Sequence, residues 1–169
     1  MGRVFAAAAT ILAFAGCSSA SESAPEETDE TVVARVGDGD SIATESGERV
    51  RLVQIDAPEL GEDECYGQEA ADVLEDLLPP GSTIRLEADP RLDDTDRFDR
   101  LLRYVHGDGL NLNVELVRRG AASVWFVDDR GRYADELLDA ARDAKEAGRG
   151  LWGTCPGTRL DPERGVDTE

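Results

Sequence analysis

The sequence predicts an α+β domain in which a small β-barrel carries three helices on its surface. Two observations lead to this class. Short β-branched segments separated by tight turns fill residues 31–55, a pattern typical of an antiparallel meander. In three other segments, apolar residues recur at helical spacing. The 169 residues are enough for one such domain with an extension at each end.

The predicted strands occupy six segments of the chain. Tight turns at residues 37–40 and 46–48 separate the first three strands, and a polar loop at residues 89–99 joins the next two. The six segments are residues 31–36, 41–44, 49–55, 82–88, 101–105 and 121–127.

The predicted helices cover residues 64–78, 112–119 and 133–147. Pro79-Pro80-Gly81 ends the first helix, because proline cannot continue it. Asn111 is a candidate N-cap of the second helix, and Gly120 stands at its end. The apolar face of the third helix consists of Ala134, Leu137, Leu138, Ala141 and Ala144.

The N-terminus is predicted to carry an export signal. Residues 4–14 form an apolar run behind Arg3 that is too short to span a bilayer but suits the core of a signal peptide. Small residues before Cys17 resemble the bacterial lipoprotein cleavage signal, which implies a lipid on its thiol and an exported, cell-surface lipoprotein. An ordinary secretory signal, giving a secreted protein, and an uncleaved anchor are the alternatives.

The regions that flank the domain are polar. Residues 18–30 contain no large apolar side chain and are expected to form an acidic, disordered tether after the signal peptide of residues 1–17. Residues 157–169 are expected to form a polar C-terminal tail. The folded domain is therefore placed at residues 31–156.

The two remaining cysteines, Cys65 and Cys155, are candidates for a disulfide because an exported protein enters an oxidising compartment. Such a bridge would close a loop of about 90 residues, for which the chain-entropy model gives about 4–5 kcal/mol. Two unrelated buried thiols are the alternative. A zinc site is disfavoured, since two cysteines and His106 supply too few ligands.

Two charged segments are candidates for chemistry, although each alone is typical of a turn or a solvated edge. Asp38-Gly39-Asp40-Ser41 places two carboxylates in a tight turn, and the stretch from Arg49 to Glu59 runs from a strand into a polar turn. Strict alternation would put Arg51 and Asp56 on opposite faces of that strand. Their convergence needs a bulge, or a strand that ends before Asp56, which Pro58 favours.

Taken together and in order, these motifs resemble the staphylococcal nuclease (thermonuclease) family over about residues 31–156. The resemblance implies a five-stranded OB-fold β-barrel with three helices, which agrees with the predicted order of elements. The matching stretches are residues 36–41, 51–59, 66–70, 96–100, 113–120 and 150–152.

The resemblance also implies a Ca²⁺-dependent nuclease that cleaves DNA and RNA with low sequence specificity, leaving 3′-phosphate and 5′-hydroxyl ends. Asp40, Asp56 and the backbone carbonyl of Ala57 match the family's metal ligands, and oxygen ligands suit Ca²⁺. Glu59 matches the glutamate that orients or deprotonates the attacking water. Arg51 and Arg100 match the two arginines that grip the phosphate, whose developing charge guanidinium groups stabilise.

The chain departs from the family pattern around the substrate. Asp99 replaces a glycine, and Phe98 replaces a tyrosine that contacts phosphate. Arg97 stands at a phosphate-binding lysine, and Phe126 is a candidate base-stacking residue, whereas Asp128 replaces a second tyrosine. These changes are expected to alter affinity for the substrate more than the chemistry. The expected substrate is single-stranded or denatured nucleic acid.

The charge of the chain needs to be judged locally. The formal net charge is −19; residues 1–30 contribute −4 and residues 157–169 contribute −2, which leaves −13 on the domain. Such a field argues against a general nucleic-acid coat protein, which would carry a basic surface. A metal ion and a few placed arginines can still hold one phosphate, and salt would screen the wider repulsion.

Two other functions fit the same sequence. One is a non-catalytic OB-fold module that binds nucleic acid or another protein, and the second is a structural lipoprotein of the envelope. Nothing in the sequence indicates more than a monomer.

Overall fold

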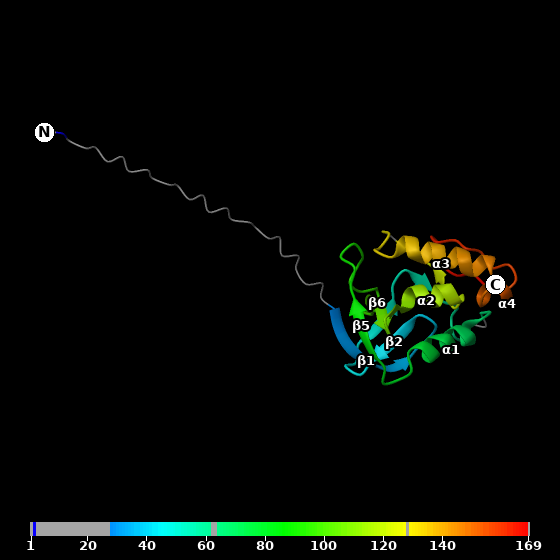
Figure 1. The fold of residues 1–169 in the computed structure, drawn as a ribbon. Coiled ribbons are helices and arrows are strands. Elements are labelled where there is room, and N and C mark those ends of the chain that lie inside the picture. Colours follow the sequence, from blue (N-terminus) through cyan, green and yellow to red (C-terminus); the bar gives the residue numbers. More distant parts are fainter. Residues whose placement is uncertain (1, 3–27, 62–63, 128, 169) are drawn as a thin grey trace.

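The computed structural model describes residues 2, 28–61, 64–127 and 129–168 (Figure 1). The predicted signal peptide apart from Gly2, the predicted lipidation site Cys17, most of the predicted tether, and Asp128 lie outside these residues. Within the part of the chain that is described, no helix is both long and apolar enough to cross a membrane.

Five strands close into a barrel, which confirms the predicted fold class. Their order is β3-β2-β1-β5-β6, and β6 pairs with β3 to complete the circle. This closing pair is parallel, whereas the other neighbours in the barrel are antiparallel. The five strands are β1 (Thr28–Val36), β2 (Ser41–Thr44), β3 (Arg49–Leu52), β5 (Thr83–Glu87) and β6 (Leu101–Gly107).

Three short strands lie outside the barrel. β7 (Leu110–Asn111) extends the sheet beyond β6, and β4 (Ile55–Asp56) pairs with β8 (Ser123–Val124) in a separate two-stranded ribbon. The ribbon starts three residues after β3 ends, so it holds Asp56 close to the barrel strand that carries Arg51.

The helices are α1 (Gly67–Leu77), α2 (Leu112–Arg119), α3 (Ala134–Glu146) and a short α4 (Leu151–Thr154) that was not expected. Helices α2, α3 and α4 gather on one side of the barrel, and α1 packs separately against β1 and α2 (Figure 1). The predicted caps of α2 are confirmed. The Asn111 side chain accepts a hydrogen bond from the Val114 N–H at 3.3 Å, and Gly120 takes the left-handed conformation after Arg119.

The core fills the barrel and the space beneath the helices. The predicted apolar face of α3 is buried along its whole length, as periodicity requires. Burial of this face, together with the barrel interior, is the main source of the domain's stability. The largest fully buried side chains include Leu52, Ile55, Leu74, Tyr104, Leu116 and Leu137.

A disulfide joins Cys65, just before α1, to Cys155, just after α4, with 5.8 Å between their Cα atoms. The predicted pairing is therefore confirmed. The bridge fastens the end of the helical layer to the loop that precedes α1.

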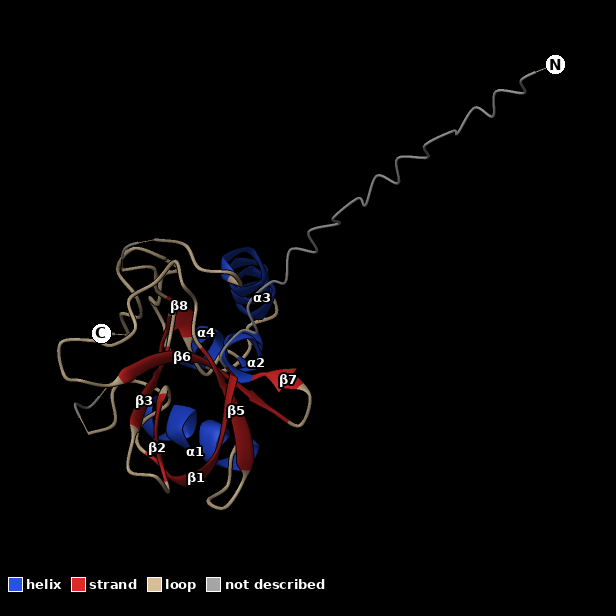
Figure 2. Cartoon of the chain, turned by 90° about the vertical axis from the view of Figure 1, so that its left-hand side faces the viewer, coloured by secondary structure: helices blue, strands red, loops and turns tan. Residues whose placement is uncertain are grey.

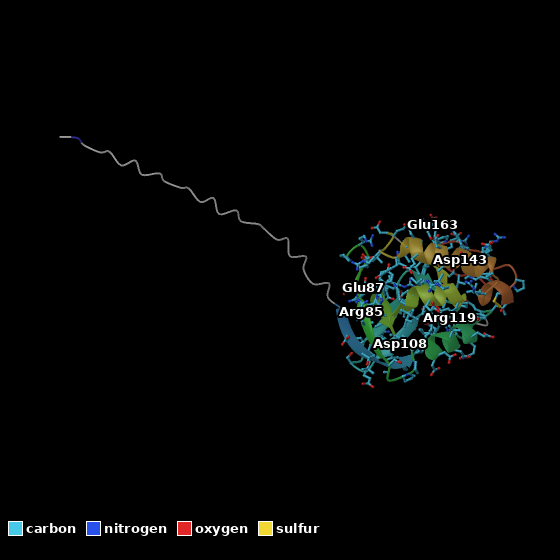
Figure 3. All side chains as sticks on the ribbon, in the orientation of Figure 1. Arg85, Glu87, Asp108, Arg119, Asp143 and Glu163 are labelled. Carbon is cyan, nitrogen blue, oxygen red and sulfur yellow. A yellow bond between two sulfur atoms is a disulfide. The ribbon has the colours of Figure 1, made fainter. Side chains whose placement is uncertain are left out.

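A buried charged cluster joins the start of α3 to the barrel. Glu87 on β5 is 3% exposed and lies 2.7 Å from both His106 Nε2 and Arg132 Nη1. The Tyr133 hydroxyl donates to the same carboxylate, and Arg85 lies near it on β5 (Figure 3). Each partner supplies a hydrogen bond or positive charge to a carboxylate that would be costly to bury alone.

The first and the last predicted strands have different bounds in the structure. β1 begins at Thr28 because residues 28–32 pair with β5, so the strand starts three residues inside the predicted tether. The predicted strand 121–127 is reduced to Ser123–Val124, since only these two residues find a partner strand.

Residues 157–168, expected as a polar tail, return to the domain. Gly165 and Thr168 are buried, and Leu160 packs against the core.

Candidate active site

The side chains of Asp40, Arg51 and Asp56 meet at the junction between the barrel and the β4–β8 ribbon. Arg51 Nη2 lies 2.8 Å from Asp40 Oδ2 and 2.9 Å from Asp56 Oδ1, so one guanidinium nitrogen joins two carboxylates. Arg51 Nη1 donates to the backbone carbonyls of Leu52 and Ile55 at 2.9 and 2.8 Å. Arg51 and Asp40 are both buried. The structure thus assembles three of the predicted site residues.

A break in the third predicted strand brings Arg51 and Asp56 to the same side. Gln54 takes a φ of +63°, and the strand ends at Leu52 before resuming at Ile55. The Gln54 side chain donates to the Asp129 carbonyl at 2.8 Å and accepts from the Tyr104 hydroxyl at 3.0 Å. These bonds hold the unusual backbone, and sequence reasoning did not identify Gln54.

The turn that carries Asp40 lies directly against α1 and the segment after Asp56. A Cβ added at Gly39 would stand 2.6 Å from the Ala57 Cβ and 2.8 Å from the Ala70 Cβ, so this approach requires glycine. The Ala57 N–H donates to Asp40 Oδ2 at 2.9 Å. These contacts fix the carboxylate of Asp40 in place.

Asp38 also belongs to the site, although the sequence analysis, which named its turn as a candidate for chemistry, gave this residue no role of its own. Its Oδ1 accepts the Asp40 N–H at 3.3 Å. Its charge is close enough to raise the pKa values of Asp40, Asp56 and Glu59. The pair of aspartates two residues apart in one turn is the sequence signal that points to this position.

The electrostatics of the site favour a bound cation. Burial raises the pKa of Asp40 well above its usual range, and the Asp38 charge adds to this rise while Arg51 opposes it. Burial also raises the pKa of Asp56, against hydrogen bonding from Val166 and the charge of Arg51. Glu59 is exposed, yet partial desolvation and the neighbouring Asp38 raise its pKa. Carboxylates crowded in this way ionise more easily beside a positive charge.

The donor atoms at this point fit a hard divalent cation. Asp40 Oδ2 and Asp56 Oδ1 both lie within 2.9 Å of one Arg51 nitrogen, so two carboxylate oxygens already face a common positive centre. Across the described parts of the chain, no group of three or more Asp, Glu, His or Cys side chains is arranged to hold a metal. Two carboxylates leave most coordination positions for water, an arrangement that oxygen-seeking Mg²⁺ and Ca²⁺ accept.

Arg100 comes directly before β6, the strand that pairs with the Arg51 strand β3, but its guanidinium is engaged elsewhere. Leu101 pairs with Val50 in the parallel β3–β6 register, which sets Arg100 beside the start of β3. Its Nε donates to Asp96 Oδ2 at 2.7 Å, and its N–H donates to Asp96 Oδ1 at 3.0 Å. Although burial opposes the shift, these bonds hold the pKa of Asp96 below its usual value. Asp96 therefore positions Arg100 and is a further residue that sequence reasoning missed.

The loop before β6 presents an aromatic ring between cations. Phe98 is 53% exposed, with the guanidinium carbons of Arg97 and Arg100 4.7 and 5.5 Å from its ring centroid. Arg49 donates to the Phe98 carbonyl. Asp99 takes a φ of +59°, a left-handed conformation that glycine adopts without strain. Arg97, predicted to bind phosphate, thus lies on an exposed loop beside the Phe98 ring, and Asp96 and Asp99 stand in the same loop.

Phe126 and Glu59 occupy different environments. The Phe126 ring is only 6% exposed and has the Arg130 guanidinium 5.3 Å from its centroid, so stacking of a base on it stays a prediction. Glu59 lies in the loop after β4, and its N–H donates to Glu64 Oε2 at 2.9 Å. Glu59 is close enough to the paired carboxylates for the charge of Asp56 to raise its pKa, and its side chain is open to solvent.

A closed OB barrel with this acidic cluster and adjoining arginines defines the chain as a phosphodiester hydrolase of the nuclease class. Comparisons with known proteins identify the family. The model of the family described as "Staphylococcal nuclease homologue" matches residues 49–154. The chain therefore belongs to the staphylococcal nuclease family, as the sequence motifs indicated.

Individual relatives extend the match. The chain is 38% identical over 124 residues to an "Uncharacterized endonuclease" of Escherichia coli O157:H7, covering 71% of this chain and 74% of that protein. It is 28% identical over 127 residues to the "Thermonuclease" of Staphylococcus hyicus, covering 71% and 73%. It also matches "Endonuclease YhcR" of Bacillus subtilis at 32% identity over 140 residues, covering 73% of this chain but only 11% of that protein.

Proposed function

We propose that this protein is an exported, Ca²⁺-dependent nuclease that hydrolyses DNA and RNA with low sequence specificity. The observation that carries the proposal is the buried arrangement of Asp40, Arg51 and Asp56, in which two carboxylate oxygens share one guanidinium nitrogen. The E. coli and B. subtilis relatives are named endonucleases, and the S. hyicus relative is named a thermonuclease. These names and the acidic site support the same activity.

Asp40 and Asp56, together with the Ala57 carbonyl, would hold the Ca²⁺ ion. When bound, the ion supplies a Lewis acid that stabilises negative charge on the reacting phosphate. The carboxylates need this positive charge, because burial raises both of their pKa values and disfavours two ionised groups side by side.

Glu59 would accept a proton from the attacking water. Its exposed side chain is accessible to that water, and its raised pKa brings it closer to the range in which a general base works well. Water attack opposite the 5′ oxygen would leave a 3′-phosphate and a 5′-hydroxyl.

The arginines would bind the phosphate. Arg100 presents a guanidinium that Asp96 orients, and the planar fork of arginine matches two phosphate oxygens. Arg51 sits directly beside the paired carboxylates and would reach a phosphate held next to them. Arg97, exposed on the same loop, would contact a neighbouring phosphate, which suits single-stranded or denatured substrates.

The site of action would be the cell surface or the exterior. The apolar run of residues 4–14 and the small residues before Cys17 support export and a lipid anchor, and the disulfide of the domain suits an oxidising compartment. Labelled palmitate would enter the wild-type protein and be absent from Cys17→Ala. Equal labelling of the two proteins would contradict the anchor.

The activity is tested by incubating residues 28–169 with denatured DNA, and separately with RNA, in Ca²⁺ or EDTA over a range of salt. We expect cleavage only with Ca²⁺, and products whose 5′ ends accept phosphate from a polynucleotide kinase without prior dephosphorylation. No Ca²⁺-dependent cleavage at any salt concentration would reject the enzyme and leave a non-catalytic OB-fold module.

A further inference from the structure

The C-terminal segment formed by residues 161–168 reaches the proposed metal ligand Asp56. The Val166 N–H donates to Asp56 Oδ2 at 2.9 Å, across 110 residues of sequence. The other oxygen, Oδ1, faces Arg51 Nη2 at 2.9 Å. The two oxygens of one carboxylate are therefore divided between the C-terminal segment and the center of the site.

The C-terminal segment is a defined structure. The N–H groups of Arg164 and Gly165 both donate to the Asp161 carbonyl at 3.1 Å, and the Glu163 N–H donates to Asp161 Oδ1. The Pro162 carbonyl accepts from the Phe126 N–H at 2.6 Å, which fastens the turn beside the β4–β8 ribbon. Figure 2 shows the chain end on the side of the barrel where β3 and β8 lie, and Figure 3 labels Glu163 within the segment.

Gly165 fits closely against the carboxylate. It is buried, and an added Cβ would stand 2.5 Å from Asp56 Oδ2 and 3.3 Å from Trp125 Cγ. Its φ of +76° also favours glycine. No side chain could occupy this position without moving the Asp56 carboxylate or the segment itself.

We propose that Gly165 and Val166 are positioning residues that hold the Asp56 carboxylate for metal binding. Groups that hydrogen-bond a metal-binding carboxylate from behind fix its orientation, and their loss typically costs about 10–100-fold in metal affinity. By holding Oδ2, the segment keeps Oδ1 directed at the point that Asp40 Oδ2 also faces. The inference rests on the proposed function, because it assumes that Asp56 binds Ca²⁺.

Two matched pairs of variants test this role in the protein of residues 28–169. Val166→Pro removes the N–H, whereas Val166→Ala keeps it and shortens only the side chain. Gly165→Ala adds a methyl group at the carboxylate, whereas Gly157→Ala adds one at a similar φ of +96° where nothing lies within 4 Å. The second pair therefore separates contact with Asp56 from the backbone strain that both substitutions introduce.

The measurement is the dissociation constant for Ca²⁺ alone, by isothermal titration calorimetry, beside thermal unfolding in EDTA. We expect about tenfold weaker binding in Val166→Pro and Gly165→Ala, with Val166→Ala and Gly157→Ala within about twofold of wild type. If Val166→Pro fails to fold, the glycine pair still decides. Equal Ca²⁺ affinity in both members of the glycine pair would overturn the positioning role and leave the nuclease proposal intact. Absence of Ca²⁺ binding by the wild-type protein would overturn both.

Discussion

Replacing Arg51 with methionine tests how the paired carboxylates are held when no metal is added. The substitution keeps the apolar stem and removes four contacts of 2.8–2.9 Å, two to carboxylates and two to backbone carbonyls. Removing one partner of a buried ion pair costs about 3–5 kcal/mol, because the remaining charge stays buried. We therefore expect Arg51→Met to lower the free energy of unfolding in EDTA by about this amount.

The stability lost in Arg51→Met depends on pH, and the direction of this dependence follows from the carboxyl groups of Asp40 and Asp56. Burial raises the folded-state pKa values of Asp40 and Asp56, and Arg51 opposes both rises, so the variant raises them further. A carboxyl with a raised folded pKa contributes its stability fully below the unfolded pKa and loses that stability as pH rises through the folded pKa. The loss in Arg51→Met is thus smallest at about pH 4 and largest at neutral pH.

The assay is urea unfolding at several pH values, with and without Ca²⁺. Arg142→Met is the control, because Arg142 is exposed and forms only a surface ion pair with Asp139, worth at most about 1 kcal/mol. Added Ca²⁺ should restore more stability to Arg51→Met than to wild type, since the ion would neutralise the same oxygens. A loss below about 1 kcal/mol at neutral pH would refute the role of Arg51 in holding the carboxylates.

Substitutions at three other places test the proton acceptor, the phosphate-binding arginine and the disulfide. Glu59→Gln should lower kcat by about 10²–10⁴-fold while urea unfolding stays unchanged, because the side chain is exposed; normal turnover would remove Glu59 as the base. Arg100→Ala should abolish cleavage with little loss of stability, and unimpaired turnover in this variant would contradict phosphate binding by Arg100. Asp96→Asn should lower kcat by a smaller factor, because Asp96 orients the Arg100 guanidinium through a hydrogen bond. Cys155→Ser and Cys65→Ser should each lower the free energy of unfolding by about 4–5 kcal/mol, because the bridge closes a loop of about 90 residues. The double variant should be no less stable than either single variant. A loss under about 1 kcal/mol would contradict a stabilising bridge.

Much of the fold could be predicted because its signals are local and repeated. The apolar face of α3, the caps of α2 and the turns between the first three strands each depend on residues close together in sequence. The disulfide could be predicted because only Cys65 and Cys155 remained once Cys17 was assigned to the signal. The site residues could be named from the order of their motifs along the chain.

The missed features depend on contacts between distant segments. Gln54 breaks its strand because its side chain is held by Tyr104 and by backbone groups of residues 129–131, far along the chain. The C-terminal segment has no hydrophobic periodicity that could indicate a packed structure, and its contact with Asp56 spans 110 residues. The covered face of Phe126 likewise depends on where Arg130 lies in the folded protein. Such features become visible only when the whole domain is assembled.

The central claim is that Asp40 and Asp56 hold the Ca²⁺ ion that cleavage requires. The most direct test compares the initial rate of cleavage of denatured DNA against Ca²⁺ concentration in the wild-type protein and in Asp56→Asn. We predict no cleavage in EDTA, a saturable response to Ca²⁺, and a requirement in the variant for at least about tenfold more Ca²⁺. Cleavage that persists in EDTA, or an unchanged Ca²⁺ requirement in Asp56→Asn, would contradict the claim.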